Sequence, residues 1–173
     1  MKKASDRACL VAAMLVAGAF VAGASPVPAS AKVPPAPKIR GVDADNHKVI
    51  LNKPGVISLV LCTGEDSQNA ARRAGRSMYP LQGRPDFQLV VVVDLRGSLA
   101  AWVPSVVLSQ MRSNLDQEAP DLKPYFLANG NKSNPREASH VIADFHGTLC
   151  AQLGWTESSD QLRGILLDRK SVV

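Results

Sequence analysis

The run of residues 87–94, FQLVVVVD, constrains the fold more than any other stretch of the chain. It places four valines in a row between Leu89 and Asp94. Valine is β-branched, so its rotamers are restricted in a helix, whereas it packs well on a pleated sheet. A continuous apolar run predicts a strand that is buried on both faces. Residues 56–62, VISLVLC, have the same character, so we expect a parallel sheet covered by helices.

A helix is predicted directly after the earlier of these two strands. The turn there reads TGEDSQ, and Asp66 or Ser67 can begin the helix, which we expect to continue to about Tyr79. Residues 96–98 turn the chain after the valine run. Pro104 then suits the first turn of a second helix, because its missing N–H has no intrahelical partner there.

The second half of the chain continues the alternation of helices and strands. We expect the second helix to end near Gln117, because residues 119–137 are rich in Pro, Asn and Gly and are typical of a loop. Residues 140–143 and 163–168 predict two further strands, and residues 149–153 a short helix or strand. Strands that alternate with helices indicate an α/β layer fold.

Residues 1–31 have the features of a signal peptide: a basic start, an uncharged apolar run over residues 8–24 and the small-x-small pattern of residues 29–31. Cleavage after residues 22–24 is an alternative. The segment could also be a retained membrane anchor, since it approaches the ~18 apolar residues that a spanning helix needs. We favour cleavage after residue 31, and therefore a periplasmic or secreted protein.

Cleavage would leave a proline-rich lead-in, residues 32–38, and one domain, residues 39–173. We expect this domain to open with a hairpin around residues 43–46, DADN, because Asp and Asn tolerate turn geometry. The mature chain would carry 17 basic and 14 acidic residues. So mild an excess gives no reason to expect a nucleic-acid partner, and we expect no membrane span after cleavage.

Two cysteines, Cys62 and Cys150, would remain, and export would place them in an oxidising compartment. They could form one disulfide or stay as two separate buried thiols, since a bridge needs α-carbons within roughly 4.4–6.8 Å. Cys62 ends a predicted parallel strand, where α/β folds place their sites. Free cysteine is also among the most buried residue types, which favours a core role.

The order of these segments resembles that of peroxiredoxins and related thioredoxin-fold redoxins. Residues 36–51 are similar to their opening hairpin, and residues 56–62 and 87–94 to their central parallel strands. Residues 141–147, VIADFHG, followed by residues 153–155, LGW, resemble their strand, Asp-x-x-Gly turn and Leu-Gly segment. The resemblance implies a thioredoxin-like central mixed sheet, flanked by helices and preceded by an N-terminal hairpin.

The chemical motifs of these families are missing from the chain. Thioredoxins carry a C-x-x-C pair just after the first central strand, where residues 65–68 contain no cysteine. Peroxiredoxins use T-x-x-C, but here Thr63 is followed by Asp66 at the cysteine position, and a carboxylate cannot replace a thiolate nucleophile. Only residues 169–173 follow the last predicted strand, so we expect no C-terminal helix. The sheet face is then exposed or covered by another chain, or the gene product is a truncated one.

We therefore favour an exported, non-catalytic accessory or binding module of the cell envelope, with an envelope protein or a second copy as partner. The alternative is a thiol-dependent oxidoreductase or peroxidase that uses Cys62 with Cys150 as partner. Thr63 and Asp66 are the other candidate site residues, because they stand where the peroxiredoxin motif would lie. Whether the chain is an enzyme stays open at this point, and we expect no cofactor.

A copper site is a weaker alternative. His146 and Cys150 are four residues apart and would share a face of a helix, with His140 nearby in sequence. Exported thioredoxin-fold copper chaperones use a C-x-x-x-C pair, which this chain lacks. Glu65 and Asp66 could do acid–base work, although a helix N-terminus favours acidic residues through its dipole alone.

Overall fold

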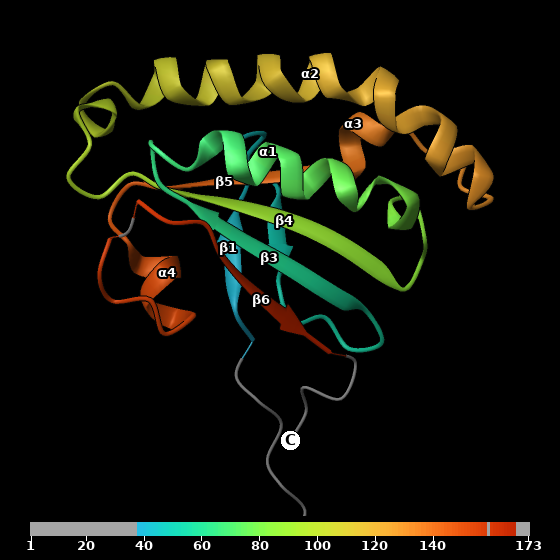
Figure 1. The fold of residues 1–173 in the computed structure, drawn as a ribbon, viewed down its shortest axis with the longest axis horizontal. Coiled ribbons are helices and arrows are strands. Elements are labelled where there is room, and N and C mark those ends of the chain that lie inside the picture. Colours follow the sequence, from blue (N-terminus) through green and yellow to red (C-terminus); the bar gives the residue numbers. More distant parts are fainter. Residues whose placement is uncertain (1–37, 159, 169–173) are drawn as a thin grey trace, which may run out of the picture. The chain divides into compact units, whose positions relative to one another are not determined.

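The computed structural model describes residues 38–158 and 160–168, which form a layered α/β arrangement (Figure 1). Its central sheet has four strands in the order β5-β4-β3-β6. The strands are β3 (Ile57–Thr63), β4 (Phe87–Asp94), β5 (His140–Asp144) and β6 (Arg163–Leu167). β3, β4 and β5 are parallel, whereas β6 is antiparallel to β3. The predicted central mixed sheet, flanked by helices and preceded by an N-terminal hairpin, is confirmed.

The valine run forms the centre of this sheet, as the sequence predicts. β4 pairs with β3 on one side and with β5 on the other. Successive side chains of a strand point to opposite faces, so Val90 and Val92 face one side of the sheet and Val91 and Val93 the other. Val90 and Val92 are fully buried, because both sheet faces are covered.

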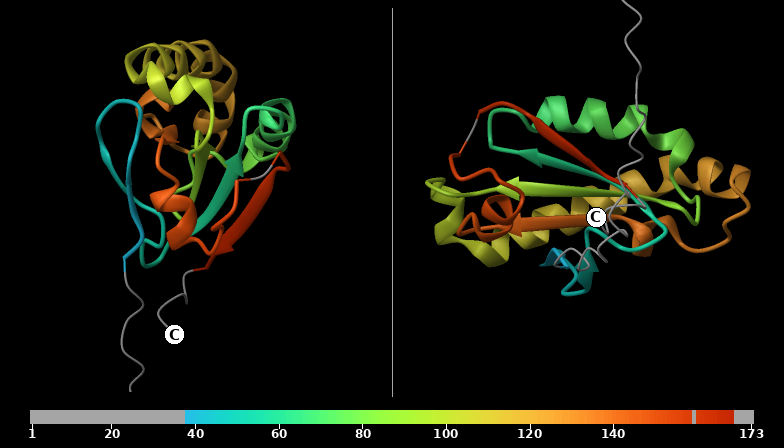
Figure 2. Two further views of the ribbon diagram at one scale, coloured as in Figure 1. Left: turned by 90° about the vertical axis from the view of Figure 1, so that its left-hand side faces the viewer. Right: turned by 90° about the horizontal axis from the view of Figure 1, so that it is seen from below.

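Helices cover one face of the sheet. They are α1 (Gln68–Ser77), α2 (Pro104–Ala128) and α3 (Pro135–Ala138), with two short 3-10 helices, η1 (Tyr79–Leu81) and η2 (Leu99–Trp102). The crossovers from β3 to β4 and from β4 to β5 step in the same direction, and right-handed crossovers then put α1 and α2 on the same face. Figure 2 shows both helices running along the sheet on this face.

The predicted hairpin and a short helix cover the opposite face. The hairpin consists of β1 (Arg40–Val42) and β2 (Lys48–Ile50), and the helix is α4 (Thr148–Gln152). Asp43 shapes the hairpin turn, since its Oδ1 accepts hydrogen bonds from the backbone N–H of Asp45 at 3.0 Å and of His47 at 2.8 Å. The core on this face contains Val49, Leu51, Val60, Cys62, Val90, Val92, Ile142, Leu149, Cys150 and Leu153.

The end of α2 differs from the prediction. The helix continues to Ala128 through Pro120 and Pro124, where we expected a loop. Each proline removes an intrahelical hydrogen bond at a cost of about 3 kcal/mol, and the helix bends in this part (Figure 1). Leu122 and Phe126 are only 4% and 2% exposed, and burying each contributes about 1.5–3 kcal/mol. The burial of these two side chains therefore offsets much of the free-energy cost of the two prolines.

β6 is an edge strand of the sheet, and among the described residues it pairs only with β3. Leu166 of this strand is 62% exposed, and within the described residues no helix follows β6. Among these residues, no helix is both long and apolar enough to serve as a membrane span. The predicted signal peptide, residues 1–31, and nearly all of the lead-in lie outside the described residues, as do residues 169–173.

Candidate functional site

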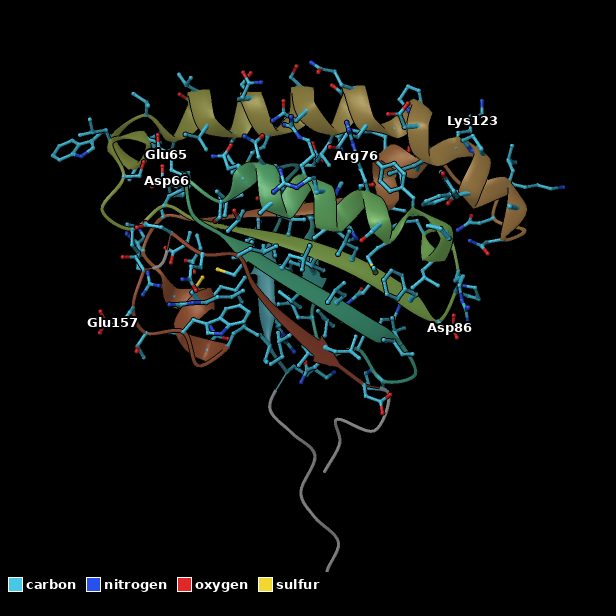
Figure 3. The ribbon with its side chains drawn as sticks, viewed as in Figure 1. Glu65, Asp66, Arg76, Asp86, Lys123 and Glu157 are labelled. Carbon is cyan, nitrogen blue, oxygen red and sulfur yellow. The ribbon has the colours of Figure 1, made fainter. Side chains whose placement is uncertain are left out.

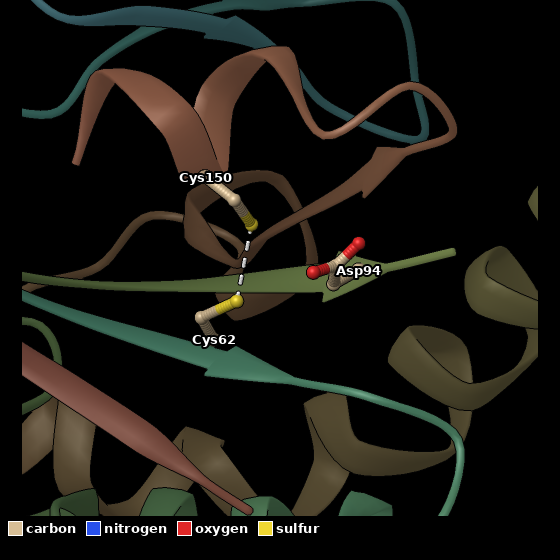
Figure 4. Close-up of side chains that lie close together, drawn as sticks. All are labelled: Cys62, Asp94 and Cys150. Atoms are coloured by element: carbon tan, nitrogen blue, oxygen red, sulfur yellow. Dashed lines mark hydrogen bonds between the residues drawn. The ribbon is translucent and has the colours of Figure 1, made fainter. Parts of the chain in front are cut away.

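Cys62 of β3 and Cys150 of α4 meet in the core that the hairpin covers. Their Sγ atoms are 3.1 Å apart (Figure 4), and both cysteines are free thiols. The side chains are buried, with exposed fractions of 4% for Cys62 and 0% for Cys150. The separation is longer than the ~2.05 Å of a disulfide and corresponds to an S–H···S contact. The two sulfurs therefore form an adjacent dithiol.

The turn after β5 places Cys150 at this position. The backbone N–H of Cys150 donates a hydrogen bond of 2.8 Å to Oδ2 of Asp144, the last residue of β5. Gly147, in the same turn, has a φ of +69°, and a Cβ there would lie 1.9 Å from Cδ of Arg96. The Asp-x-x-Gly segment thus begins α4 and admits the Arg96 side chain beneath it.

Asp94, at the end of β4, is the third group beside the sulfurs (Figure 4). Arg96 binds its carboxylate through Nε at 2.9 Å and through Nη2 at 2.6 Å. The same guanidinium donates to the backbone carbonyl oxygens of residues 155 and 156. Burial raises the pKa of Asp94, but the hydrogen bonds from Arg96 outweigh burial and hold it below its ordinary value. The sequence analysis missed this ion pair, although Asp94 ends the clearest strand of the chain.

The contact between the thiols makes them unequal. The hydrogen bond with Cys150 lowers the pKa of Cys62, against burial and the nearby charge of Asp94, which both raise it. The same contact, together with burial, raises the pKa of Cys150. Cys62 therefore ionises first, with the Cys150 thiol as its hydrogen-bond donor. Because the thiolate is the nucleophilic form of cysteine, this order makes Cys62 the better candidate for a nucleophile.

Thr63 and Asp66 do not join the two cysteines. Thr63 is buried, but its side chain points to the sheet face opposite to that of Cys62. Its Oγ1 lies 2.9 Å from Oγ of Ser67, which is the residue that precedes α1. Asp66 is exposed at the same turn, beside Glu65 (Figure 3). Of the four predicted site residues, the structure thus brings together only the two cysteines.

The residues weighed for copper are not assembled into a site. Within the described residues, His140, His146 and Cys150 do not form a group of metal-ligating side chains. Nδ1 of His140 instead lies 2.9 Å from Oδ2 of Asp43, a buried residue of the hairpin turn. His140 therefore ties β5 to the hairpin.

Two other clusters of potential ligands occur among the described residues: Cys62, Asp94 and Cys150, and Asp43, Asp45 and His47. The carboxylates of both clusters already accept hydrogen bonds from protein groups. Arg96 donates hydrogen bonds to the carboxylate of Asp94, and Arg136 donates to the carboxylate of Asp45 at 2.6 and 3.0 Å. Both carboxylates are therefore held in place by arginine side chains.

The chain was compared with protein-family models, with curated proteins and with solved structures. No protein-family model and no curated protein matches the chain. It is similar to the solved structure of MTB dsbF in its mixed oxidized and reduced forms, with 13% identity over 74% of this chain and 83% of that chain, and a TM-score of 0.40. It is also similar to the thioredoxin domain of a thiol-disulfide oxidoreductase from Bacteroides vulgatus, with 16% identity over 83% and 86% of the two chains and a TM-score of 0.40. Neither likeness assigns an activity to this chain.

Proposed function

We propose that this chain is a thioredoxin-like redox protein in which Cys62 and Cys150 interconvert between a dithiol and a disulfide. The observation that carries the proposal is the 3.1 Å between the two Sγ atoms. A shift of about 1 Å brings them to disulfide distance. The pair differs from a C-x-x-C motif, because its cysteines are 88 residues apart in the sequence and belong to a strand and a helix on one sheet face.

The burial of both sulfurs selects a small oxidant, and we take it to be a hydroperoxide. The Cys62 thiolate attacks a peroxide oxygen, the O–O bond breaks, and an alcohol or water leaves as Cys62 becomes a sulfenic acid. The Cys150 sulfur then attacks the sulfenic sulfur, which forms the S–S bond and releases water. The two thiols supply the two electrons, and two equivalents of an external thiol return the pair to the dithiol and become a disulfide themselves.

Steady-state consumption of hydrogen peroxide with a small thiol reductant tests the proposal. Cys9, the third cysteine of the chain, is replaced by serine in all variants. We expect Cys62→Ser to abolish turnover, because it removes the nucleophile, and Cys150→Ser to leave one turnover that ends at the sulfenic acid. Equal turnover in the parent and in Cys62→Ser, or none in the parent, would reject the peroxide route.

The non-catalytic accessory module, which the sequence favours, is the second candidate, because sulfurs that are 4% and 0% exposed are closed to a protein disulfide partner. Under this reading a Cys62–Cys150 disulfide would form but would serve only as a structural crosslink. The exposed Glu65 and Asp66 would then belong to a binding surface at the start of α1. A disulfide that resists millimolar glutathione, combined with an absence of peroxide turnover, would support this candidate and separate it from the redox protein.

We also propose that the protein is exported, since residues 1–31 have the pattern of a signal peptide. An oxidising compartment is where a cysteine pair of this kind forms a disulfide. N-terminal sequencing of the protein from its host should begin at Lys32. A chain that retains Met1 would contradict export by cleavage at this site.

A further inference from the structure

A cavity of about 450 Å³ lies between α1, α2 and the sheet, on the face opposite to the cysteine pair. Its volume falls in the range of roughly 300–1,000 Å³ that is usual for small-molecule sites. Apolar side chains of β4 and α2 form much of its wall, among them Leu89, Val91, Val93, Met111 and Leu115. An apolar body of a ligand would therefore be removed from water here.

Polar groups are gathered at the end of this cavity near the last turn of α1. The hydroxyl of Tyr79 is buried and has no hydrogen-bond partner among the described residues. Such an unsatisfied group is unfavourable in the folded protein, unless a ligand supplies the missing partner. Arg76 also lines the cavity and lies on α1 at the side of α2 (Figure 3).

The charges around the cavity favour an anionic ligand. Arg72 pairs with Glu118 at 3.9 Å across the space between the helices. Glu65, at the far end of α1, accepts a hydrogen bond of 3.2 Å from Ser98. Within residues 38–158 and 160–168, Arg76 makes no ion pair, and it lies beside the Tyr79 hydroxyl, where Glu118 and Asp121 are the nearby acidic groups. A carboxylate accepts hydrogen bonds from both kinds of donor, and those from arginine are charge-assisted.

We propose that this cavity binds a small amphiphile of the medium-chain carboxylate class. Its hydrocarbon chain lies on the β4 wall between α1 and α2, and its carboxylate accepts hydrogen bonds from the Tyr79 hydroxyl and the Arg76 guanidinium. The site is independent of the cysteine pair, because β3 and β4 separate the two. The ligand site and the redox function can therefore be tested independently.

Calorimetric titration of the purified full chain with octanoate, decanoate, decanol and decyltrimethylammonium tests the site. Ligand concentrations stay below the critical micelle concentrations. We expect decanoate to bind with a 1:1 stoichiometry and about tenfold more tightly than octanoate, because it buries two more methylenes. Decanol should bind about tenfold more weakly than decanoate, since it lacks the charge. Decyltrimethylammonium binding as tightly as decanoate, or no binding of decanoate to the folded chain, would overturn the proposal.

Variants at the polar end of the cavity locate the ligand. Arg76→Gln should weaken decanoate binding about tenfold and leave decanol binding unchanged, and Tyr79→Phe should weaken decanoate binding about fivefold. Arg73→Gln is the matched control, because Arg73 lies on the same helix, is exposed and does not line the cavity. An equal loss in Arg73→Gln and Arg76→Gln would contradict the site. So would a stable dimer that decanoate leaves intact, because a second copy would then fill the groove.

Discussion

At the residue scale, the contact with Cys150 of α4 has the largest effect on the pKa of the Cys62 thiol. A hydrogen bond across this contact lowers the pKa of Cys62 more than burial and the charge of Asp94 raise it. The electrostatics of the site thus depend on a contact across 88 residues of sequence. The sequence alone places Cys62 at a strand end, but it contains no signal for this contact.

Replacing Cys150 should change the ionisation of Cys62. In a Cys9→Ser background, we expect Cys62 to ionise below the ordinary thiol pKa of about 8.5. Cys150→Ala removes the donor and should raise the pKa of Cys62, whereas Cys150→Ser keeps a hydroxyl donor and should raise it less. Thiolate absorbance near the ultraviolet edge measures ionisation without a reagent that has to reach the buried sulfur. Identical titrations of the alanine and serine variants would contradict the donor role.

Gly147 tests the turn that positions Cys150. Gly147→Ala places a Cβ against Arg96 and forces alanine to a φ of +69°, so we expect a loss of about 2–4 kcal/mol in unfolding free energy. Gly97→Ala is the control, because Gly97 has a φ of +74° and a Cβ there would meet no atom within 4 Å. Gly97→Ala should lower the unfolding free energy by only about 1–2 kcal/mol, which is the cost of the left-handed backbone conformation for alanine. Equal losses in urea titrations would show that Arg96 does not pack under this turn.

At the element scale, the sequence predicts what local pattern determines. The valine run, the apolar β3 and the Asp-rich hairpin turn all form as predicted, because burial, β-branching and turn chemistry agree there. The end of α2 could not be predicted from proline rules, because packing overrides them. The sequence feature that indicates the longer helix is the helical spacing of four apolar residues, which are all buried: Met111, Leu115, Leu122 and Phe126.

The docking of the last turns of α2 should be measurable. Phe126 packs against Gly83, where a Cβ would lie 2.8 Å from Cα of Phe126. Phe126→Ala should therefore lower the free energy of unfolding by about 3–5 kcal/mol. Leu127→Ala changes the neighbouring residue, which is 56% exposed, and should stay within about 0.5 kcal/mol. Similar values for both variants in chemical denaturation would support the shorter helix that the sequence predicts.

An ion pair joins the hairpin turn to α3 and should make stability depend on pH. Hydrogen bonds from Arg136 lower the pKa of Asp45 in the folded protein, although burial opposes them. A carboxyl with a lowered pKa contributes stability that is complete above its unfolded pKa of about 3.9 and is lost as the pH falls through the folded value. Arg136→Gln should therefore reduce the loss of stability on acidification. Parallel pH profiles of the thermal midpoint for parent and variant would refute this contribution.

At the scale of the whole molecule, the two cysteines connect the sheet to the layer that the hairpin and α4 form. Sequence reasoning could place Cys62 on a strand and Cys150 in a short segment. It could not place α4 over β3, because that position depends on the Asp144 turn and on the Arg96 side chain beneath it. The Asp94–Arg96 pair was missed for the same reason, since only the folded sheet brings the end of β4 to the sulfurs.

Oxidation should stabilise the molecule if the pair forms a disulfide. The crosslink would close a loop of 88 residues, and the chain-entropy relation gives about 4–5 kcal/mol for such a loop. The thermal midpoint of the oxidised Cys9→Ser protein should therefore exceed that of the reduced protein. The same comparison in the Cys62→Ser variant should show no difference. A midpoint that falls on oxidation would mean that the disulfide strains the native core.

The central claim is that Cys62 and Cys150 act as one redox pair. Peptide mapping by mass spectrometry after treatment of the reduced Cys9→Ser protein with one equivalent of hydrogen peroxide tests it most directly. We expect a single crosslinked peptide that joins Cys62 to Cys150 and a loss of both free thiols. Two intact thiols, or a Cys62 oxidised to sulfinic acid beside an unmodified Cys150, would contradict the account.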